Sequence, residues 1–335
     1  MSLGELVKDI RSYPGVTRKR TISEVLSFFP KTSQGKVLAS YGEDAAVLEF
    51  GDSVLLLAAD GIMESLMKAN PWFAGYYAIL VNINDIAAMG GIPLALVDVI
   101  SMKDEKVCGQ VMKSMDNAAR KFGVPVVGGH THPDCHYNAV DVAILGTAEK
   151  EAVIYSHTAE AGDDIIFAMD LDGYYPDRLE YAWDTTSRKD SETVRRQVLV
   201  MNGLGKRRLV RSGKDMSNPG SLGTLAMLLE TSGKGGQVDL DRIPRPKGVP
   251  FPRWLKSYQG CGFVVTAPPE CSSKVLEAFA EVGVEGAVVG KVDASSLLVL
   301  SQGEERRTLF DFTKDIITGC SPSLLPDACA CGRPS

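Results

Sequence analysis

Apolar and polar residues alternate along residues 42–60 in a pattern that is typical of a β-hairpin. Two apolar segments flank the short turn signal Gly51-Asp52. If the residues beside the turn pair directly, Glu43 lies opposite Asp60 with Asp44 beside them, whereas a loop one residue longer places Asp44 opposite Asp60. Either register brings acidic side chains to the open end of the hairpin. Opposed like charges destabilise a bare sheet, and a bound cation would reverse that effect.

Residues 70–147 contain stretches with the hydrophobic spacing of helices and others with that of strands. Asn70 and Pro71 form a cap and a first helical residue, and they predict a helix to about Met89 that is apolar on nearly every side and therefore buried. An amphipathic helix is expected over residues 104–122, and strands are expected over 93–101, 124–127 and 137–147. This order of elements predicts an α/β sandwich with helices on one face of a mixed sheet.

A small, polar segment near residues 156–164 separates two halves of similar organisation. We expect an N-terminal domain over residues 1–155, a C-terminal α/β domain over 156–320, and a disordered Pro/Gly/Cys-rich tail over 321–335. In the second half, helices are expected near 191–211, 221–232 and 270–282, and strands at 262–267, 286–292 and 296–301.

Composition and charge narrow the class of protein. The chain has 335 residues, of which 44% are hydrophobic, and a net charge of −6, which argues against a general nucleic-acid binder with a basic face. No apolar run is long enough to span a bilayer, and the N-terminus has no apolar signal core, so we expect a cytoplasmic protein without a membrane partner. The seven cysteines are irregularly spaced and predict no disulfide framework.

Four acidic residues sit at the ends of apolar segments: Asp44, Asp60, Asp85 and Asp215. A carboxylate beside so much apolar surface is costly unless something positive meets it. Their similar settings predict one convergent site, with divalent cations and phosphates as its occupants. Asn82 lies three residues before Asp85 on the same helix face and is expected in the same site.

A second feature is the sequence VVGGHTHPD, in which a strand leads into Gly128, Gly129, His130 and Thr131. Glycines let the backbone approach a bulky anion, and His130 is expected to position a phosphate or a metal. His130, His132 and Asp134 are also of the residue types that bind zinc, although their spacing matches no closed structural zinc site.

A third feature is GKDMSNPGSLGTL, in which Lys214 and Asp215 precede a Pro-Gly turn and a helix that is expected to start near Ser221. A helix N-terminus with a nearby lysine favours an anion. The Walker pattern GxxxxGK[ST], the GxSxG nucleophile elbow and the GxGxxG dinucleotide fingerprint are all missing, which argues against those three classes of enzyme.

These motifs, in the order GEDAAVL, AAD, NINDIAAMGGIP, VVGGHT and KDMSNPGSLGTL, resemble the aminoimidazole ribonucleotide (AIR) synthetase superfamily. That group includes thiamine-monophosphate kinase, selenophosphate synthetase and the hydrogenase-maturation dehydratase. The chain is most similar to the AIR synthase-related proteins, including the set called methanogenesis marker protein 2. The resemblance covers roughly residues 18–312. It implies a two-domain α/β fold, a homodimer whose N-terminal sheets pair into a β-barrel, and Mg²⁺ and ATP in a cleft between the halves.

The chain departs from the named enzymes at three motifs. Cys329 and Cys331 do not match the C-terminal cysteine motif of the hydrogenase-maturation dehydratase. The chain lacks the N-terminal Cys-Gly-Cys-Lys segment of selenophosphate synthetase, and residues 18–20 are the basic residues nearby. The SDGL motif of thiamine-monophosphate kinase appears here as KDMSNPG. At His130 the chain resembles selenophosphate synthetase, because the kinase would have an aspartate at that position.

The resemblance and the residues together predict ATP- and Mg²⁺-dependent phosphoryl transfer to an oxygen of a small polar metabolite. Two alternatives remain: a non-catalytic nucleotide-binding or assembly protein on the same fold, and a zinc-dependent hydrolase. The expected metal ligands are Asp44, Asp60, Asp85 and Asp215; the expected catalytic residues are Lys214, His130 and Asp215; and the expected nucleotide-binding residues are Gly42, Asp44, Asn82, Asp85, Gly128, Gly129 and Thr131.

Overall fold

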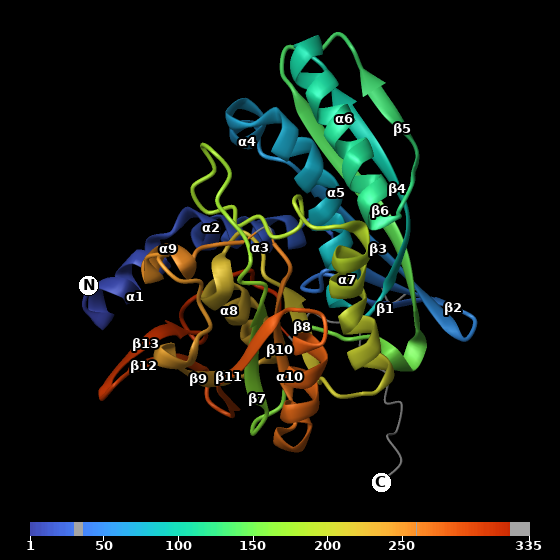
Figure 1. Cartoon of the computed structure of the whole chain (residues 1–335). Coiled ribbons are helices and arrows are strands. Elements are labelled where there is room, and N and C mark those ends of the chain that lie inside the picture. Colours follow the sequence, from blue (N-terminus) through green and yellow to red (C-terminus); the bar gives the residue numbers. More distant parts are fainter. Residues whose placement is uncertain (30–35, 259, 322–335) are drawn as a thin grey trace.

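Two β-sheets, one from each half of the chain, organise the fold (Figure 1). The computed structural model describes residues 1–29, 36–258 and 260–321. The first sheet has the strand order β1-β2-β3-β6-β4-β5, and the second has the order β13-β12-β9-β11-β7-β10-β8. Helices pack on both sheets, which confirms the expected mixed α/β architecture.

The elements follow in chain order. The α-helices are α1 (Leu3–Ser12), α2 (Pro14–Thr17), α3 (Thr21–Leu26), α4 (Glu64–Ala69), α5 (Pro71–Ala88), α6 (Glu105–Phe122), α7 (Ser191–Lys206), α8 (Gly220–Ser232), α9 (Phe251–Trp254) and α10 (Ser272–Ala280). The strands are β1 (Val37–Ala39), β2 (Ala46–Phe50), β3 (Ser53–Gly61), β4 (Ile92–Ser101), β5 (Val126–His132), β6 (Ala139–Glu149), β7 (Asp164–Met169), β8 (Ser212–Asp215), β9 (Gly235–Asp239), β10 (Gly262–Ala267), β11 (Glu285–Asp293), β12 (Leu297–Gln302) and β13 (Glu305–Asp311).

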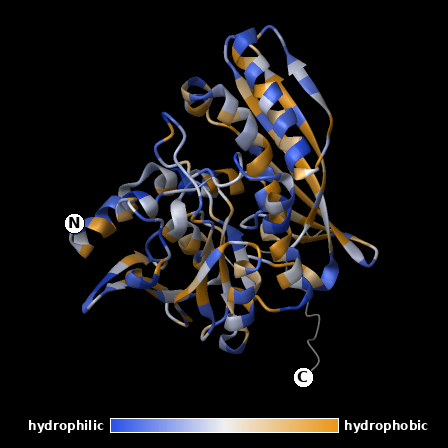
Figure 2. Ribbon diagram, viewed as in Figure 1, coloured by the Kyte–Doolittle hydropathy of each residue, from blue (hydrophilic) through white to orange (hydrophobic). Residues whose placement is uncertain are grey.

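The first sheet is built on the expected hairpin and helices. Phe50 pairs with Ser53, so the hairpin adopts the tighter of the two registers. The Asn70 side chain accepts a hydrogen bond from the Phe73 N–H at 3.2 Å, which caps α5 as expected. Helix α6 ends at Gly123, which adopts the left-handed conformation. Residues coloured as hydrophobic recur along the strands (Figure 2). On the face opposite the helices some apolar residues are exposed, among them Leu57 and Val97.

Strand β5 differs from the expectation. The predicted strand ended at Val127, but the observed strand continues to His132, so the Gly-Gly-His-Thr segment is part of the sheet rather than a loop. It runs parallel to β4 at the free edge of the first sheet. The prediction failed because glycine weakens a strand in isolation, whereas here β4 supplies the hydrogen-bonding partner.

Every residue of strands β7, β10 and β8, which lie next to one another at one end of the second sheet, is buried. Strand β8 lies at its edge and carries Lys214 and Asp215. We did not predict β8, β9 or β13 from the sequence. Strand β8 has only four residues and includes two charged side chains, which is an unusual composition for a buried strand.

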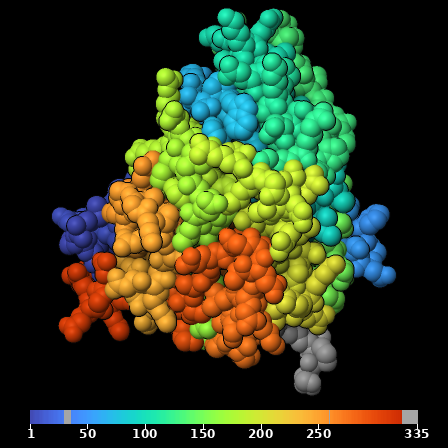
Figure 3. Space-filling view, viewed as in Figure 1, coloured from blue at the N-terminus to red at the C-terminus, as the bar shows by residue number. Residues whose placement is uncertain are grey.

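The N-terminal helix packs against the second sheet rather than the first. Leu3, Leu6 and Ile10 of α1 are buried in the core of the second half of the chain. Arg11 donates a hydrogen bond to the Leu309 carbonyl at 2.6 Å and pairs with Asp315 at 2.7 Å. In Figure 3 the blue N-terminal segment lies beside the red segment near residue 300. The segment that follows α1 therefore leads the chain from the second sheet, on which α1 packs, to the strands of the first sheet.

Two further expectations concern the ends of the chain and membranes. The tail predicted over residues 321–335 lies, beyond Ser321, outside the described residues. Within the described residues, no helix combines the length and apolar character that crossing a bilayer requires.

Candidate active site

A cavity of about 470 Å³ between the two halves of the chain contains the predicted acidic residues. It is lined by both halves and by the segment after α1, and the lining includes Gly42, Asp44, Asp60, Asp85, Lys214 and Asp215. Asp44 lies just before β2, Asp60 is near the end of β3, Asp85 is in the last turn of α5, and Asp215 ends β8. The fold therefore brings together side chains that are far apart in sequence, as the sequence predicted.

Three of these acids form a tight cluster. One carboxylate oxygen from each of Asp44, Asp85 and Asp215 lies within 4.8 Å of the other two. Asp60 lines the same cavity and is more exposed. In the part of the chain that the structure describes, this is the one group of three or more acidic, histidine or cysteine side chains close enough to share a metal ion.

Burial is the largest effect on the four predicted aspartates, and it raises the pKa of Asp44, Asp60, Asp85 and Asp215. The pKa of Asp85 is raised well above its usual range by burial, and then by the nearby charges of Asp215, Asp44 and Asp60. Burial, followed by the charge of Asp44, raises the pKa of Asp215 to about 7. A cluster that retains protons at neutral pH lacks enough positive charge of its own, so a cation would bind in place of those protons.

Lys214 supplies part of the missing positive charge. Its ammonium group pairs with Asp44, and both side chains are only 6% exposed. Burial would lower the pKa of Lys214, but the charges of Asp44, Glu43 and Asp215 outweigh it and raise the pKa to about 12. Lys214 is therefore charged. Its ion pair with Asp44 links β8 in one half of the chain to the turn before β2 in the other.

A second set of contacts holds the turn that carries Asp44. The buried Glu43 carboxylate accepts a hydrogen bond from the Ser156 N–H at 2.6 Å and contacts Nδ1 of His157. The Gly42 carbonyl accepts hydrogen bonds from the Ser156 hydroxyl at 2.9 Å and from the Lys214 ammonium at 3.3 Å. Ser156, His157 and Lys214 thus hold the turn that carries Asp44.

Gly42 has a steric reason to be glycine. Its φ of +97° is unfavourable for other residues, and an added Cβ would lie 3.0 Å from Cβ of Cys320 and 3.1 Å from Cγ2 of Thr231. Because its carbonyl already accepts hydrogen bonds from the protein, Gly42 shapes the turn and lines the cavity.

Two cationic residues that follow α2, Arg18 and Lys19, line the cavity but were not predicted as site residues. Burial lowers the pKa of the half-buried Lys19. The charge of nearby Asp60 acts in the opposite direction but has a smaller effect on that pKa. Among the described residues, no carboxylate lies within ion-pair distance of Lys19. The run of basic residues at 18–20 was the available signal, but the sequence alone did not show that it faces the acids.

Other residues of the cavity were also missed. The amide oxygen of Asn218 is buried and has no hydrogen-bond partner among the described residues. Asn84 and Tyr258 line the same cavity. A buried acceptor without a donor is costly, and its presence in the cavity is consistent with a ligand or cation that completes it.

Several predicted binding residues do not line this cavity. Asn82 is fully buried, and its Nδ2 donates to the Ala78 carbonyl at 2.9 Å, so the structure does not place it in the lining of this cavity. The same helix presents Asn84 and Asp85 to the cavity instead.

The Gly-Gly-His-Thr segment is also elsewhere. Asp60 pairs with Val142, Val142 with Asp98, and Asp98 with Gly129, so three strand spacings, roughly 14 Å, separate Asp60 from that segment. Gly128, Gly129, His130 and Thr131 therefore do not reach the acids of their own chain. The cause is the strand order, which places β5 at the far edge of the sheet.

The structure gives no support to two other predicted sites: a zinc site at His130, His132 and Asp134, and an anion site at the start of α8. His130 and His132 lie with their ring centroids 4.5 Å apart on exposed β5, but in the described residues they form no metal-binding group with Asp134. The start of α8 is closed by the protein itself, because the Ser221 N–H donates to the Leu255 carbonyl at 3.1 Å. That helix end therefore does not offer this N–H to an anion.

Two family models match most of the folded chain. The AIR synthase related protein N-terminal domain matches residues 42–148, and the AIR synthase related protein C-terminal domain matches residues 173–301. The uncharacterized protein MJ0640 of Methanocaldococcus jannaschii is 42% identical over 324 residues, which are 96% of this chain and 100% of that protein.

More distant similarities reach proteins with named activities. A selenide, water dikinase of Carboxydothermus hydrogenoformans is 24% identical over 240 residues, which are 68% of each chain. The solved structure of T. maritima PurL complexed with ADP has a TM-score of 0.73 and 18% identity, and the match covers 90% of this chain and 51% of that one. At that identity the structural likeness demonstrates a shared fold.

Proposed function

This chain belongs to the AIR synthase-related family, and from that premise we propose that it catalyses Mg²⁺- and ATP-dependent phosphoryl transfer to an oxygen of a small polar metabolite. The observation that carries the proposal is the group of buried carboxylates, Asp44, Asp85 and Asp215, beside Lys214 in one cavity. Phosphoryl transfer depends mainly on positioning and on stabilisation of charge, and this cavity contains groups suited to both.

The residues of the cavity fit Mg²⁺. The cluster offers hard carboxylate oxygens, which Mg²⁺ prefers. Oxygens on opposite sides of a Mg²⁺ ion are about 4.2 Å apart, so a cluster within 4.8 Å needs only small side-chain adjustments. Asp44, Asp85 and Asp215 would hold the ion, with Asp60 as a further ligand nearby. A bound Mg²⁺ would neutralise phosphate charge.

Cationic side chains of the chain would orient the phosphates. Lys214 holds Asp44 in place and keeps a positive charge inside the cavity. Lys19 has no ion-pair partner among the described residues and would contact a phosphate oxygen. The similarity to a dikinase, and to a protein whose structure contains ADP, supports a nucleotide as the ligand.

We also propose that the chain forms a homodimer through the open face of the first sheet. Leu57, Val97, Val99 and Leu145 on that face are 37–47% exposed. Leu57 pairs with Leu145 across β3 and β6, and Val97 and Val99 of β4 pair with residues 143 and 141 of β6, so all four lie on the same face of neighbouring strands. A large exposed apolar patch is typical of an interaction site, and a second copy of the sheet would cover it. His130 would then have a role at the interface rather than beside the acids of its own chain.

Calorimetry tests the proposed ligand. We expect ATP to bind the wild-type chain with Mg²⁺ and not with excess EDTA. Asp60→Asn and Asp85→Asn should each weaken binding at least tenfold, while Asp52→Asn, at the exposed hairpin turn, serves as the control and should bind normally. Normal binding by both site variants would refute the assignment of these acids.

A metabolite screen then tests the reaction. Wild-type protein should convert ATP faster in the presence of one class of acceptor, and Asp85→Asn should not. Tight Mg²⁺–ATP binding with slow hydrolysis that no acceptor accelerates would instead favour the non-catalytic nucleotide-binding protein. Stoichiometric zinc in the purified protein would favour the hydrolase.

A further inference from the structure

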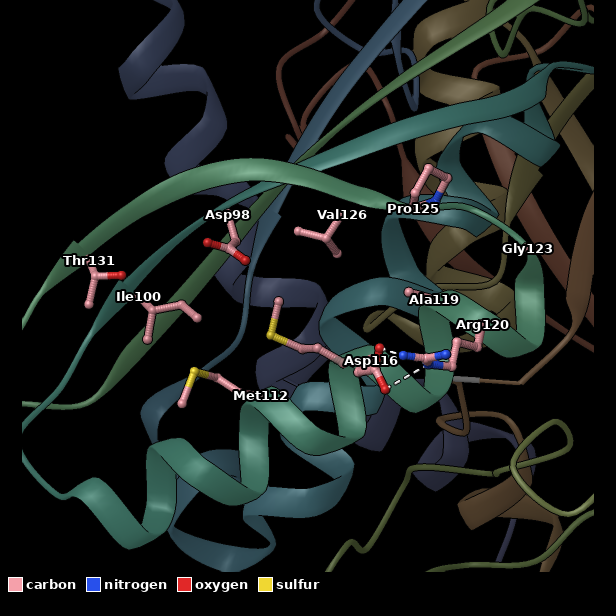
Figure 4. A pocket seen from close by; sticks show the side chains of 11 residues that line it. Asp98, Ile100, Met112, Asp116, Ala119, Arg120, Gly123, Pro125, Val126 and Thr131 are labelled. Atoms are coloured by element: carbon pink, nitrogen blue, oxygen red, sulfur yellow. Dashed lines mark hydrogen bonds and ion pairs between the residues drawn. The ribbon is translucent and has the colours of Figure 1, made fainter.

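A second cavity lies on the helix side of the first sheet, away from the acids. It is a groove of about 570 Å³ between α6 and strands β4 and β5, and its lining includes Asp98, Ile100, Met112, Met115, Val126 and Thr131 (Figure 4). This volume is in the range of sites that bind small molecules.

The walls of the groove are mainly apolar. Ile100 and Met115 are buried at its base, whereas Met112 and Val126 at its rim are 46% and 37% exposed. Methionine side chains adapt to the shape of a ligand more readily than branched ones. The exposed apolar surface at the rim would be removed from water by a ligand with an apolar body.

Asp98 is the unusual residue of this groove. Its carboxylate is half-buried among the apolar walls, and in the described part of the chain it has no hydrogen bond and no ion pair. The buried carboxylates of the second sheet are treated differently: Asp163 pairs with Arg211, and Asp164 pairs with Lys291. The Asp98 carboxylate is therefore available to a cation that enters the groove, beside apolar walls that would partly exclude water from the pair.

Gly129 makes room for this carboxylate. A Cβ at Gly129 would lie 2.2 Å from Oδ1 of Asp98 and 2.5 Å from its backbone oxygen, so any other residue would displace one of the two. Gly128 faces open space, where an added Cβ would come no nearer than 4.0 Å to Val97. Glycine weakens a strand, but the absence of a side chain at Gly129 leaves the space that the Asp98 carboxylate occupies.

The charges around the groove favour a monocation. Asp116 is already paired with Arg120 at 2.8 Å across one turn of α6, which leaves the charge of Asp98 uncompensated. We propose that this groove binds a small organic cation, with its ammonium group on Asp98 and its apolar body against Met112 and Met115. This site is separate from the acid cavity and does not depend on the proposed phosphoryl transfer.

Methyl NMR of the full chain with ¹³C-labelled methionines tests the proposal. The probes are n-pentylammonium and its neutral isostere 1-pentanol. We expect n-pentylammonium to shift the methyl signals of Met112 and Met115 and to bind at least tenfold more tightly than pentanol, because a charged hydrogen bond forms with Asp98. Met216 and Met227, which line the acid cavity, should not respond.

Variants separate a cation site from a merely apolar groove. Asp98→Asn should reduce the preference for the cation to less than twofold. Gly129→Ala should reduce it too, whereas Gly128→Ala should retain it. Equal binding of the two probes to the wild type would overturn the proposal, as would an unchanged preference in Asp98→Asn or shifts confined to Met216 and Met227. If Asp98→Asn does not fold, the comparison of the two probes on wild-type protein decides.

Discussion

The ion pair of Lys214 with Asp44 allows a quantitative test of the charge balance in the acid cavity. The proposed change is Lys214→Met, which preserves the length of the side chain and removes its charge. Both partners are 6% exposed, so removal of the lysine leaves a buried carboxylate beside Asp85 and Asp215 with less compensation. Breaking a buried pair in this way costs about 3–5 kcal/mol.

This cost translates into a measurable change in melting temperature. Unfolding entropy is about 2.1 cal/mol/K per residue, or roughly 0.7 kcal/mol/K for 335 residues. We therefore expect metal-free Lys214→Met to melt about 4–7 °C below the wild type in differential scanning calorimetry with EDTA. The control is Lys68→Met, because Lys68 pairs with Glu64 on the surface at 70% and 53% exposure and should change the Tm by less than about 1 °C.

A double variant tests the electrostatic cause. Asp44→Asn alone should destabilise less than Lys214→Met, because Lys214 retains Glu43 and Asp215 as neighbours. Asp44→Asn combined with Lys214→Met removes both charges and should melt above Lys214→Met alone. A Tm of Lys214→Met within 1 °C of the wild type, or a double variant no more stable than the single one, would refute the reasoning.

Three further predictions concern the acid cavity and the open sheet face. The pKa of Asp215 is raised from 3.8 to about 7 in the folded chain, so the folded state holds more protons than the unfolded state between about pH 4 and 7. In EDTA, the Tm of wild type relative to Asp215→Asn should therefore fall from about pH 4 to 7 and level off above pH 7, and a constant difference would contradict this. Lys19→Met should weaken Mg²⁺–ATP binding about tenfold in calorimetry with no loss of Tm, and unchanged affinity would exclude a phosphate contact. Val99→Asp should convert a dimer into a monomer in sedimentation velocity, with exposed Lys68→Met as the control, and a wild-type monomer would refute the homodimer.

The sequence determined the local elements wherever a short-range signal was strong. Asn70 and Pro71 start α5 through a side-chain cap and a preset backbone angle, and Gly123 ends α6 in the left-handed conformation. The Gly51-Asp52 turn sets the hairpin register, which brings Asp44 and Asp60 to the same end. These features depend on neighbouring residues and could be read from the chain.

The grouping of Asp44, Asp60, Asp85 and Asp215 could also be predicted, since each acid has an apolar setting that makes isolation costly. Asn82 was predicted from a shared helix face and the Gly-Gly-His-Thr segment from its glycines, and neither lines the cavity that holds the acids. Helical spacing shows that two residues share a face but not which of them contacts a cavity. A glycine-rich motif likewise does not determine where its strand lies in the sheet.

The tertiary structure alone decided the contacts between distant segments. Lys214 reaches Asp44 across 170 residues, and the segment after α1 carries Lys19 over the acids because α1 packs on the second sheet. Likewise, Asp98 and Gly129 meet because β4 and β5 are parallel neighbours, which no local pattern specifies. The local sequence determines where helices, strands and turns form. The burial of two separate apolar cores determines which of these elements pack against one another.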